Sequence, residues 1–219
     1  MCGIFAYMGA KLATPILVEG LRRLEYRGYD SAGIAVKDES FSVYKKVGKV
    51  AELQSILPNN VPGNVGIAHT RWATHGVVSD ENAHPHASVS GDVIIVHNGI
   101  IENSRTLRTL LERKGISLSS ETDSETIAHI LDYELSRDNN PTAAMHRTIS
   151  KLHGTWGICA IFLNHDVMVC ARNGSPLIIG KGDNEMFISS DPHALTTHTQ
   201  RVVFLEDGDI ATLTSDSIV

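Results

Sequence analysis

The sequence predicts one α+β domain in which helices lie outside stacked antiparallel sheets. Short runs rich in Val, Ile and Phe, bounded by Gly, Asn or Asp, recur along the chain and are typical of β-strands. From Trp156 onward these runs follow one another with gaps too short for a crossover helix, so we expect that stretch to be antiparallel. Four other segments repeat apolar residues at helical spacing.

The expected strands are distributed over the whole chain. They are Gly3–Met8, Gly33–Val36, Phe41–Val47, Val65–Ala68, Val93–Val96, Trp156–Leu163, Val167–Ala171, Leu177–Ile179, Met186–Ser189, Val202–Leu205 and Ile210–Leu213. The run Asp92-Val-Ile-Ile-Val-His97 is apolar without alternation. Such a strand is buried on both faces, and we expect it to lie between another sheet and a layer of helices.

The expected helices are marked by their first residues. Thr14-Pro15 has the pattern of an N-cap followed by a first-turn proline. Asn103 is expected to cap a helix over Ser104–Lys114, with Leu107, Leu110 and Leu111 on its apolar face. Another helix is expected to start near Asp123, and Asn140-Pro141 opens the last.

Composition excludes several classes of protein. The chain has 219 residues and no Ser/Gly-rich linker, so we expect one domain over residues 1–219. The net charge of −6 argues against a general binder of nucleic acid or membrane surfaces. No apolar run approaches the roughly 18 residues that cross a bilayer. The three cysteines form no C-x-x-C pair, which favours a reducing compartment, and we expect a cytoplasmic protein.

Cys2 is the first candidate nucleophile. Removal of Met1 would leave a residue that carries both a thiol and a free α-amine. Because both groups can ionise near neutral pH, the amine can take the thiol proton and activate the sulfur without a histidine base. The alternative is an ordinary small residue at a processed terminus, and the position alone favours that alternative.

Five further segments place polar residues and glycines at the ends of expected strands and helices. They are Leu24-Glu-Tyr-Arg-Gly-Tyr-Asp-Ser-Ala-Gly33, His69-Thr-Arg-Trp-Ala-Thr-His-Gly76, Asn82-Ala-His-Pro-His86, Val96-His-Asn-Gly-Ile-Ile-Glu-Asn103 and Ser120-Glu-Thr-Asp-Ser-Glu125. Together with Cys2-Gly-Ile4, and in this order, they resemble the N-terminal glutaminase domain of the glucosamine-6-phosphate synthases (glutamine–fructose-6-phosphate aminotransferases, isomerizing). The resemblance covers essentially the whole chain. It implies a class II glutamine amidotransferase with the N-terminal-nucleophile hydrolase fold, a four-layer αββα sandwich of two stacked antiparallel sheets.

The resemblance also implies the chemistry of the site. Cys2 matches the nucleophile that attacks the side-chain amide carbon of L-glutamine and forms a thioester, releasing ammonia. Asn98 and Gly99 match the pair that donates hydrogen bonds to the developing oxyanion, one through its side-chain NH2 and the other through its backbone N–H. From the residues alone, an ordinary Asn-Gly turn is the favoured interpretation of this pair.

Glutamine carries an α-carboxylate and an α-ammonium, so a selective pocket needs one charge of each sign. Arg71 can bind the carboxylate through two parallel hydrogen bonds. Asp123 can receive the ammonium. The alternatives are a surface arginine and a helix N-cap aspartate, and Asp123 could combine both of its roles.

Four more residues match positions of the family's active site. Trp72, Thr74 and His75 match a mobile loop that closes over bound glutamine, although Trp72 could instead pack in a core. Arg27 matches an active-site arginine near the N-terminal residue, and we expect it to organise the site.

We expect neither a metal nor a cofactor. The histidines at positions 69, 75, 84, 86 and 97 cluster in the sequence but show no recognisable ligand spacing. No phosphate-binding glycine loop is present. Cys159 and Cys170 lie in apolar runs, so we expect buried, inert thiols.

The expected function is hydrolysis of L-glutamine to L-glutamate and ammonia. In the family, C-terminal sugar-isomerase domains use the ammonia to make glucosamine 6-phosphate from fructose 6-phosphate, a step of hexosamine biosynthesis; these domains are absent from this chain. We expect the full-length enzyme to be a homo-oligomer. Two alternatives stay open: the glutaminase domain of another class II amidotransferase, and a non-catalytic glutamine-binding regulatory module.

Overall fold

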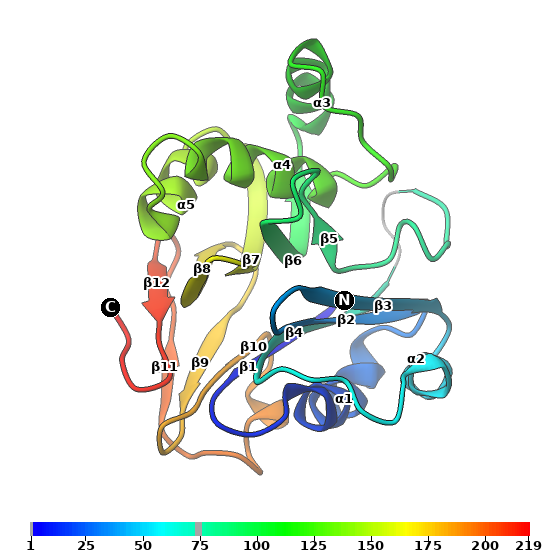
Figure 1. Ribbon diagram of the computed structural model, residues 1–219, viewed down its shortest axis with the longest axis vertical. Helices are drawn as coiled ribbons and strands as arrows, with labels where there is room; N and C mark the ends of the chain where they lie inside the picture. Colours follow the sequence, from blue (N-terminus) through cyan, green and yellow to red (C-terminus); the bar gives the residue numbers. More distant parts are fainter. Residues whose placement is uncertain (1, 73–75) are drawn as a thin grey trace.

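In the computed structural model, which describes residues 2–72 and 76–219, two antiparallel sheets lie face to face between two layers of helices (Figure 1). The lower helices in that view cover one sheet, and the upper, green helices cover the other. This is the four-layer αββα arrangement that the sequence resemblance implies. The predicted fold class is therefore confirmed.

The larger sheet is built mainly from the two ends of the chain. Its strands are β1 (Gly3–Met8), β2 (Ser31–Lys37), β3 (Phe41–Val47), β4 (Val65–Arg71), β9 (Ile178–Lys181), β10 (Met186–Ser189) and β11 (Val202–Phe204). Among the described residues their order is β11-β9-β10-β1-β4-β2-β3. Four helices lie on the side of this sheet: α1 (Ala13–Leu24), α2 (Val50–Ile56) and the short 3-10 helices η1 (Glu25–Arg27) and η2 (Pro192–Ala194). Leu17 and Leu21 of α1 pack against Phe5 of β1 and are fully buried.

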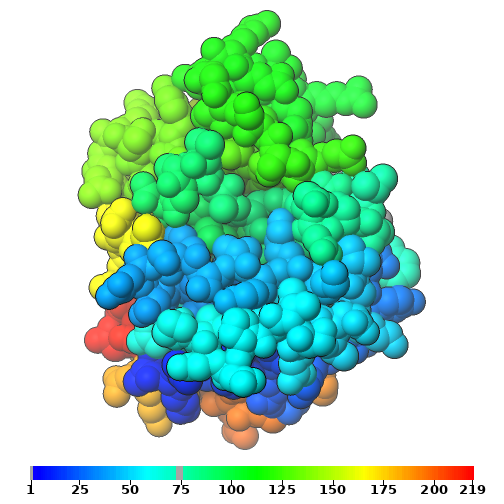
Figure 2. Space-filling model, turned by 45° about the vertical axis from the view of Figure 1, so that its right-hand side comes forward, coloured from blue at the N-terminus to red at the C-terminus, as the bar shows by residue number. Residues whose placement is uncertain are grey.

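The smaller sheet comes from the middle of the chain and its last strand. Its strands are β5 (His86–Ala87), β6 (Val93–Ile101), β7 (Gly154–Phe162), β8 (His165–Asn173) and β12 (Ile210–Leu213), in the order β12-β8-β7-β6-β5 within the described residues. Helices α3 (Ser104–Arg113), α4 (Ser124–Leu135) and α5 (Pro141–Ile149) cover its outer face. In the space-filling view, the blue and cyan segments that contain β2, β3 and α2 lie below the green segments that contain α3 (Figure 2).

Strand β6 shows how the layers are held together. Ile94 and Val96 enter the core between the two sheets, whereas Val93 and Ile95 enter the core beneath the helices. Burying each of these side chains contributes roughly 1.5–3 kcal/mol. The expectation of a strand buried on both faces is confirmed, and the pairings of β7 to β12 are antiparallel as predicted.

Two strands that carry predicted site residues, β4 and β6, continue beyond their apolar runs. β4 continues to Arg71 because His69, Thr70 and Arg71 pair with β2, opposite Gly33, Ala32 and Ser31. β6 continues to Ile101 because its last residues pair with the start of β7. Both extensions carry polar residues into the sheets, and hydrophobicity alone does not predict them.

Two predicted helix caps are wrong. Helix α1 begins at Ala13, one residue before Thr14, and has no side-chain cap. The side chain of Asn103 donates to the Lys151 carbonyl and accepts from the His153 N–H, so it joins α3 to a loop instead of capping α3. Asn140 does cap α5, because its side chain accepts from the Ala143 N–H.

Smaller differences have simple causes. Leu110 is 44% exposed and is not part of the buried face of α3. The prediction missed α2 because only Val50 and Leu53 of that short helix are buried, too few to show a periodic pattern. It also missed the two-residue strand β5. In the part of the chain that the structure describes, no helix has the length and apolar character needed to cross a membrane.

Candidate active site

Cys2 lies at one end of the larger sheet, directly before β1. Because Gly3 of β1 pairs with Thr70 of β4, Cys2 is brought beside Arg71 and Trp72. The Trp72 N–H donates to Cys2 Sγ over 3.2 Å. Burial raises the pKa of the Cys2 thiol, although the Trp72 hydrogen bond opposes the shift. The thiol therefore needs a base before its sulfur can act as a nucleophile.

One small pocket, of about 30 Å³, brings together five of the predicted site residues. Its lining consists of Cys2, Arg71, Trp72, His84, His97, Gly99, Thr122, Asp123 and Ser124. These residues come from the residue before β1, the end of β4 and the residue after it, the segment before β5, the polar end of β6 and the start of α4. The two sheets and one helix thus meet at the predicted nucleophile.

Asn98 and Gly99 lie within β6, paired with Gly157 and Trp156 of β7. The interpretation of this pair as an ordinary turn is therefore wrong. The Asn98 Nδ2 donates to the Cys2 carbonyl over 3.2 Å, which places an amide NH2 beside the nucleophile's residue. Gly99 has φ +132, and a Cβ at this position would lie 2.1 Å from the Thr155 carbonyl oxygen. Only glycine fits there without displacing β7.

Arg71 and Asp123 bring opposite charges to the pocket. Arg71 is 4% exposed, so the interpretation as a surface arginine is wrong. Its Nη1 donates to the Val77 carbonyl over 3.3 Å, and burial lowers the pKa of Arg71 from its ordinary value. Asp123 precedes α4, but its carboxylate does not cap the helix and instead accepts from the Ile101 N–H over 2.7 Å. The N-cap side-chain role is therefore wrong.

Trp72 and Arg27 flank the nucleophile in different ways. Trp72 is 46% exposed and meets Tyr29 edge-on at 5.8 Å, so it does not pack in a core. Arg27 Nε donates to the Cys2 carbonyl over 3.2 Å, and its Nη1 pairs with Asp191 Oδ2 at 2.8 Å. Arg27 thus holds the main chain of Cys2 and does not itself line the pocket. Thr74 and His75 lie outside the described residues.

Sequence reasoning missed several neighbours of the site. His84, Thr122 and Ser124 line the pocket, and all three belong to segments singled out for their polar composition, which was the available signal. His97, which lies inside β6, also lines the pocket, and its Nδ1 lies 2.8 Å from Ser124 Oγ. Asp191, which holds Arg27, had no local signal because it lies 164 residues away in the sequence.

The other two cysteines are buried thiols, and the described histidines belong to no metal site. Cys159 and Cys170 are fully buried between the sheets, as predicted. Burial raises the pKa of Cys170 to about 12 and that of Cys159 well above its ordinary value. Within residues 2–72 and 76–219, no group of three His, Cys, Asp or Glu side chains is arranged to hold a metal ion.

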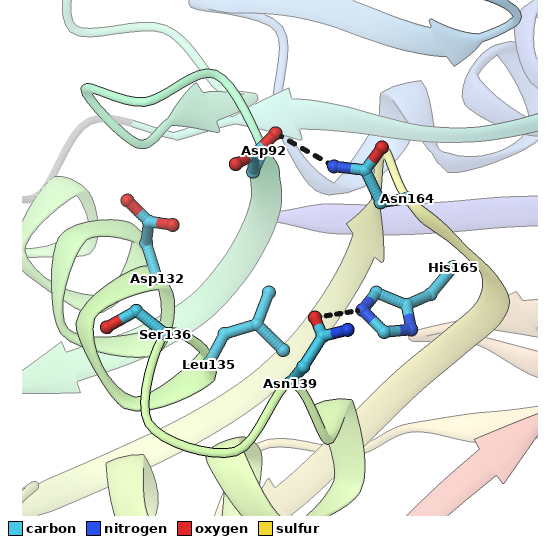
Figure 3. Close-up of a pocket in the computed structure, with 7 residues that line it drawn as sticks. All are labelled: Asp92, Asp132, Leu135, Ser136, Asn139, Asn164 and His165. Carbon is cyan, nitrogen blue, oxygen red and sulfur yellow. Dashed lines mark hydrogen bonds between the residues drawn. The ribbon is translucent and has the colours of Figure 1, made fainter.

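A larger pocket, of about 280 Å³, lies elsewhere and is drawn in Figure 3. It is lined by Asp92, Asp132, Leu135, Ser136, Asn139, Asn164 and His165. Its polar groups are partly paired with one another, because Asn164 donates to Asp92 over 3.2 Å and Asn139 Oδ1 lies 2.9 Å from His165 Nε2. None of the predicted site residues that the structure describes lines it.

Comparisons with known proteins agree with this geometry. The family described as "Glutamine amidotransferase domain" matches residues 69–197. A glutamine–fructose-6-phosphate aminotransferase [isomerizing] from Chlorobaculum tepidum is 48% identical over 99% of this chain and 36% of its own length. Its namesake from Aliivibrio fischeri is 47% identical over 100% of this chain and 36% of its own length. The chain thus spans about a third of the length of these curated relatives.

Among solved structures, the glutamine phosphoribosylpyrophosphate amidotransferase from B. subtilis has a similar fold, with a TM-score of 0.85. It is 25% identical to this chain, and the match covers 100% of this chain and 48% of that one. The fold is therefore that of the N-terminal-nucleophile hydrolases. Because the family match extends over more than half of the sequence, this chain belongs to the glutamine amidotransferase domain family.

Proposed function

We propose that this chain hydrolyses L-glutamine to L-glutamate and ammonia with Cys2 as the nucleophile, as the glutaminase domain of a glutamine–fructose-6-phosphate aminotransferase (isomerizing). The observation that carries the proposal is the meeting of Cys2, Arg71, Gly99 and Asp123 around one pocket. This set supplies a nucleophile, an oxyanion donor and both charges needed to recognise an α-amino acid.

The nucleophile requires a base. Removal of Met1 gives Cys2 a free α-amine, which takes the thiol proton. The thiolate attacks the side-chain amide carbon of glutamine, the C–N bond breaks, and the amide nitrogen leaves as ammonia with the proton that the amine held. Water then attacks the thioester carbon, the C–S bond breaks, and glutamate leaves as the thiol regains its proton.

Asn98 and Gly99 stabilise the oxyanion that forms in each attack. The Asn98 NH2 already points to the main chain of Cys2, and the Gly99 backbone borders the same pocket. Both donors belong to the interior of a paired strand, so they are fixed before the charge develops. Fixed donors are effective because no reorganisation accompanies the reaction.

Arg71 and Asp123 select glutamine by its α-groups, and four other residues complete the site. The Arg71 guanidinium binds the α-carboxylate and the Asp123 carboxylate receives the α-ammonium. Trp72 helps to cover bound glutamine, a role that the proposal also gives to Thr74 and His75. Arg27 holds the Cys2 carbonyl and so organises the nucleophile's residue.

The acceptor is proposed from the relatives. Proteins named glutamine–fructose-6-phosphate aminotransferase are 47–48% identical to this chain, against 25% for the phosphoribosylpyrophosphate amidotransferase, which favours the amino-sugar branch over other class II amidotransferases. In the full-length enzyme, C-terminal isomerase domains bind fructose 6-phosphate and receive the ammonia, and the enzyme is a homo-oligomer. Three free thiols support a cytoplasmic location.

Replacing Cys2 tests the chemistry. Cys2→Ala should abolish glutamate release from glutamine and leave the circular dichroism spectrum and thermal melt unchanged, because Cys2 lies before β1 and outside the cores. In the unsubstituted chain, a thiol-alkylating glutamine analogue should label Cys2 alone, as read by intact mass and peptide mapping.

Cys170→Ala is the matched control, since this thiol is buried between the sheets. It should retain hydrolysis and labelling. Hydrolysis by the Cys2→Ala chain, or labelling of Cys159 or Cys170, would reject the proposed nucleophile. Formation of glucosamine 6-phosphate from glutamine and fructose 6-phosphate by the full-length protein tests the acceptor separately.

A further inference from the structure

His69 connects the larger sheet to the oxyanion residue of the smaller one. It belongs to β4 and is 1% exposed. Its Nε2 lies 2.9 Å from Asn98 Oδ1 and 3.1 Å from the carbonyl oxygen of His97. Both partners belong to β6, so one ring nitrogen spans the space between the two sheets.

The partners determine where the proton lies. A main-chain carbonyl only accepts hydrogen bonds, so Nε2 must carry a hydrogen to lie 3.1 Å from the His97 oxygen. His69 Nδ1 is buried and has no hydrogen-bond partner among the described residues. A proton on Nδ1 would therefore bury an unpaired donor. These contacts assign the neutral Nε2–H tautomer.

The orientation of the Asn98 amide follows from the same reasoning. One end of the amide lies 3.2 Å from the Cys2 carbonyl, which accepts only, so that end must be the NH2. The other end faces the Nε2–H of His69 and must be the carbonyl. If position 69 offered no donor, a half-turn rotation of the Asn98 amide would break fewer hydrogen bonds than it does with His69 in place. That rotation would turn the NH2 away from Cys2.

We propose that His69 is a positioning residue for the oxyanion site: its Nε2–H holds the Asn98 side-chain carbonyl and thereby keeps the Asn98 NH2 directed to the nucleophile's residue. The kinetic consequence of this role rests on the proposed glutaminase function. His69 does not itself line the pocket or touch the reacting atoms, and it acts through Asn98.

The surroundings keep the ring in place and uncharged. His84 stacks on His69 with ring centroids 4.1 Å apart and an angle of 27° between the planes. The His84 segment lies close over β2, where a Cβ on Gly33 would be 2.1 Å from the His84 carbonyl. Burial lowers the pKa of His69 to about 3, so the tautomer persists throughout the neutral range.

Two polar substitutions of similar character separate positioning from general packing. In His69→Gln, the side-chain amide nitrogen can reach the position that Nε2 occupies in His69. In His69→Asn the side chain is shorter, and its amide nitrogen lies near the position of Nδ1. We expect His69→Asn to lower kcat for glutamine hydrolysis about 10- to 100-fold, up to the effect of losing an oxyanion donor, with KM changed less than about twofold. His69→Gln should recover most of that loss.

A double-mutant cycle with Asn98→Ala tests whether His69 acts through Asn98. Once the Asn98 side chain is removed, adding His69→Asn should lower kcat little further. Equal losses of kcat in both backgrounds, or a rise of KM with kcat unchanged, would overturn the proposal. Thermal melts of the four chains confirm that each is folded.

A measurement independent of activity distinguishes failure of this inference from failure of the proposed function. In 15N NMR spectra of the unsubstituted chain, His69 should show a protonated Nε2 and an unprotonated Nδ1. The Asn98 side-chain amide protons should exchange with water faster in His69→Asn than in His69→Gln. A protonated Nδ1, or equal exchange in both variants, contradicts the positioning role even if the chain proves inactive on glutamine.

Discussion

At the scale of single residues, the site depends on buried charges of opposite sign. Arg71 and Asp123 are 4% and 9% exposed, and both face the pocket that Cys2 lines. Burying a charge is costly, and the ionic α-groups of an amino acid would offset part of that cost for both side chains. In the proposed function, these two charges recognise the substrate, whereas Asn98 and Gly99 act on the reacting carbonyl.

This division predicts a specific kinetic signature for Asp123→Asn. The substitution keeps the shape of the side chain and its acceptor for the Ile101 N–H but removes the charge that receives the ammonium. We expect KM for glutamine to rise about 10- to 100-fold, the usual cost of losing a charged hydrogen bond, with a smaller effect on kcat. Asp132→Asn on the same helix α4, at the larger pocket of Figure 3, is the control and should leave KM unchanged. Equal KM values for the two variants would contradict the assignment.

At the scale of elements, the site uses the polar ends of two long strands. β4 and β6 continue beyond their apolar runs because their main chains keep pairing with β2 and β7. Side chains in a paired strand have little freedom, so the ends of β4 and β6 hold Arg71 and Asn98 more rigidly than a loop would. The close approach of β6 to β7 in turn requires glycine at position 99.

Gly99→Ala should therefore destabilise the fold as well as the site. The alanine would need φ +132 and would place its Cβ against the Thr155 carbonyl. Gly91→Ala is the matched control, because Gly91 has φ +80 but nothing within 4 Å of the added carbon. We expect the free energy of unfolding to fall by about 1–2 kcal/mol for Gly91→Ala. It should fall at least about 2 kcal/mol further for Gly99→Ala, measured by urea denaturation. Similar decreases in the free energy of unfolding for the two variants would show that β7 leaves room for a Cβ at position 99.

At the scale of the whole molecule, the packed layers of sheets and helices enclose uncharged histidines. His69, His84, His86 and His97 are at most 5% exposed, and burial lowers the pKa of each of them. His86 Nε2 lies 3.1 Å from the Thr122 hydroxyl, and its ring meets the His84 ring edge-on at 4.6 Å. The interior thus holds these rings in their neutral form. In the unfolded chain the same histidines are exposed to water and can take up protons.

This difference predicts loss of stability in weak acid. Below the ordinary histidine pKa of about 6.5, the unfolded chain binds protons that the folded chain does not, so the free energy of unfolding falls as pH falls. Each such histidine adds up to about 1.4 kcal/mol per pH unit to the slope. Urea denaturation between pH 7 and pH 5 measures the slope, which should decrease by about one proton in His86→Gln. An unchanged slope in that variant would show that His86 is charged in the folded chain.

The sequence by itself determined the layers and most of the site residues. Runs of Val, Ile and Phe specify strands wherever they are bounded by turn residues, which is why β1, β3, β10 and β12 have the predicted bounds. Cys2, Arg71, Trp72, Gly99 and Asp123 were identified through motifs that resemble a known family, and the structure brings them to one pocket.

Only the tertiary structure decided how these residues are oriented. The carboxylate of Asp123 accepts from the Ile101 N–H instead of capping its helix, and Asn98 lies in a strand and not in a turn. Asp191 holds Arg27, and His69 holds Asn98. The physical reason is that each orientation is set by a hydrogen-bond partner 22 to 164 residues distant in the sequence. Local propensity cannot specify such partners, because the packing of the two sheets and their helices brings them within reach.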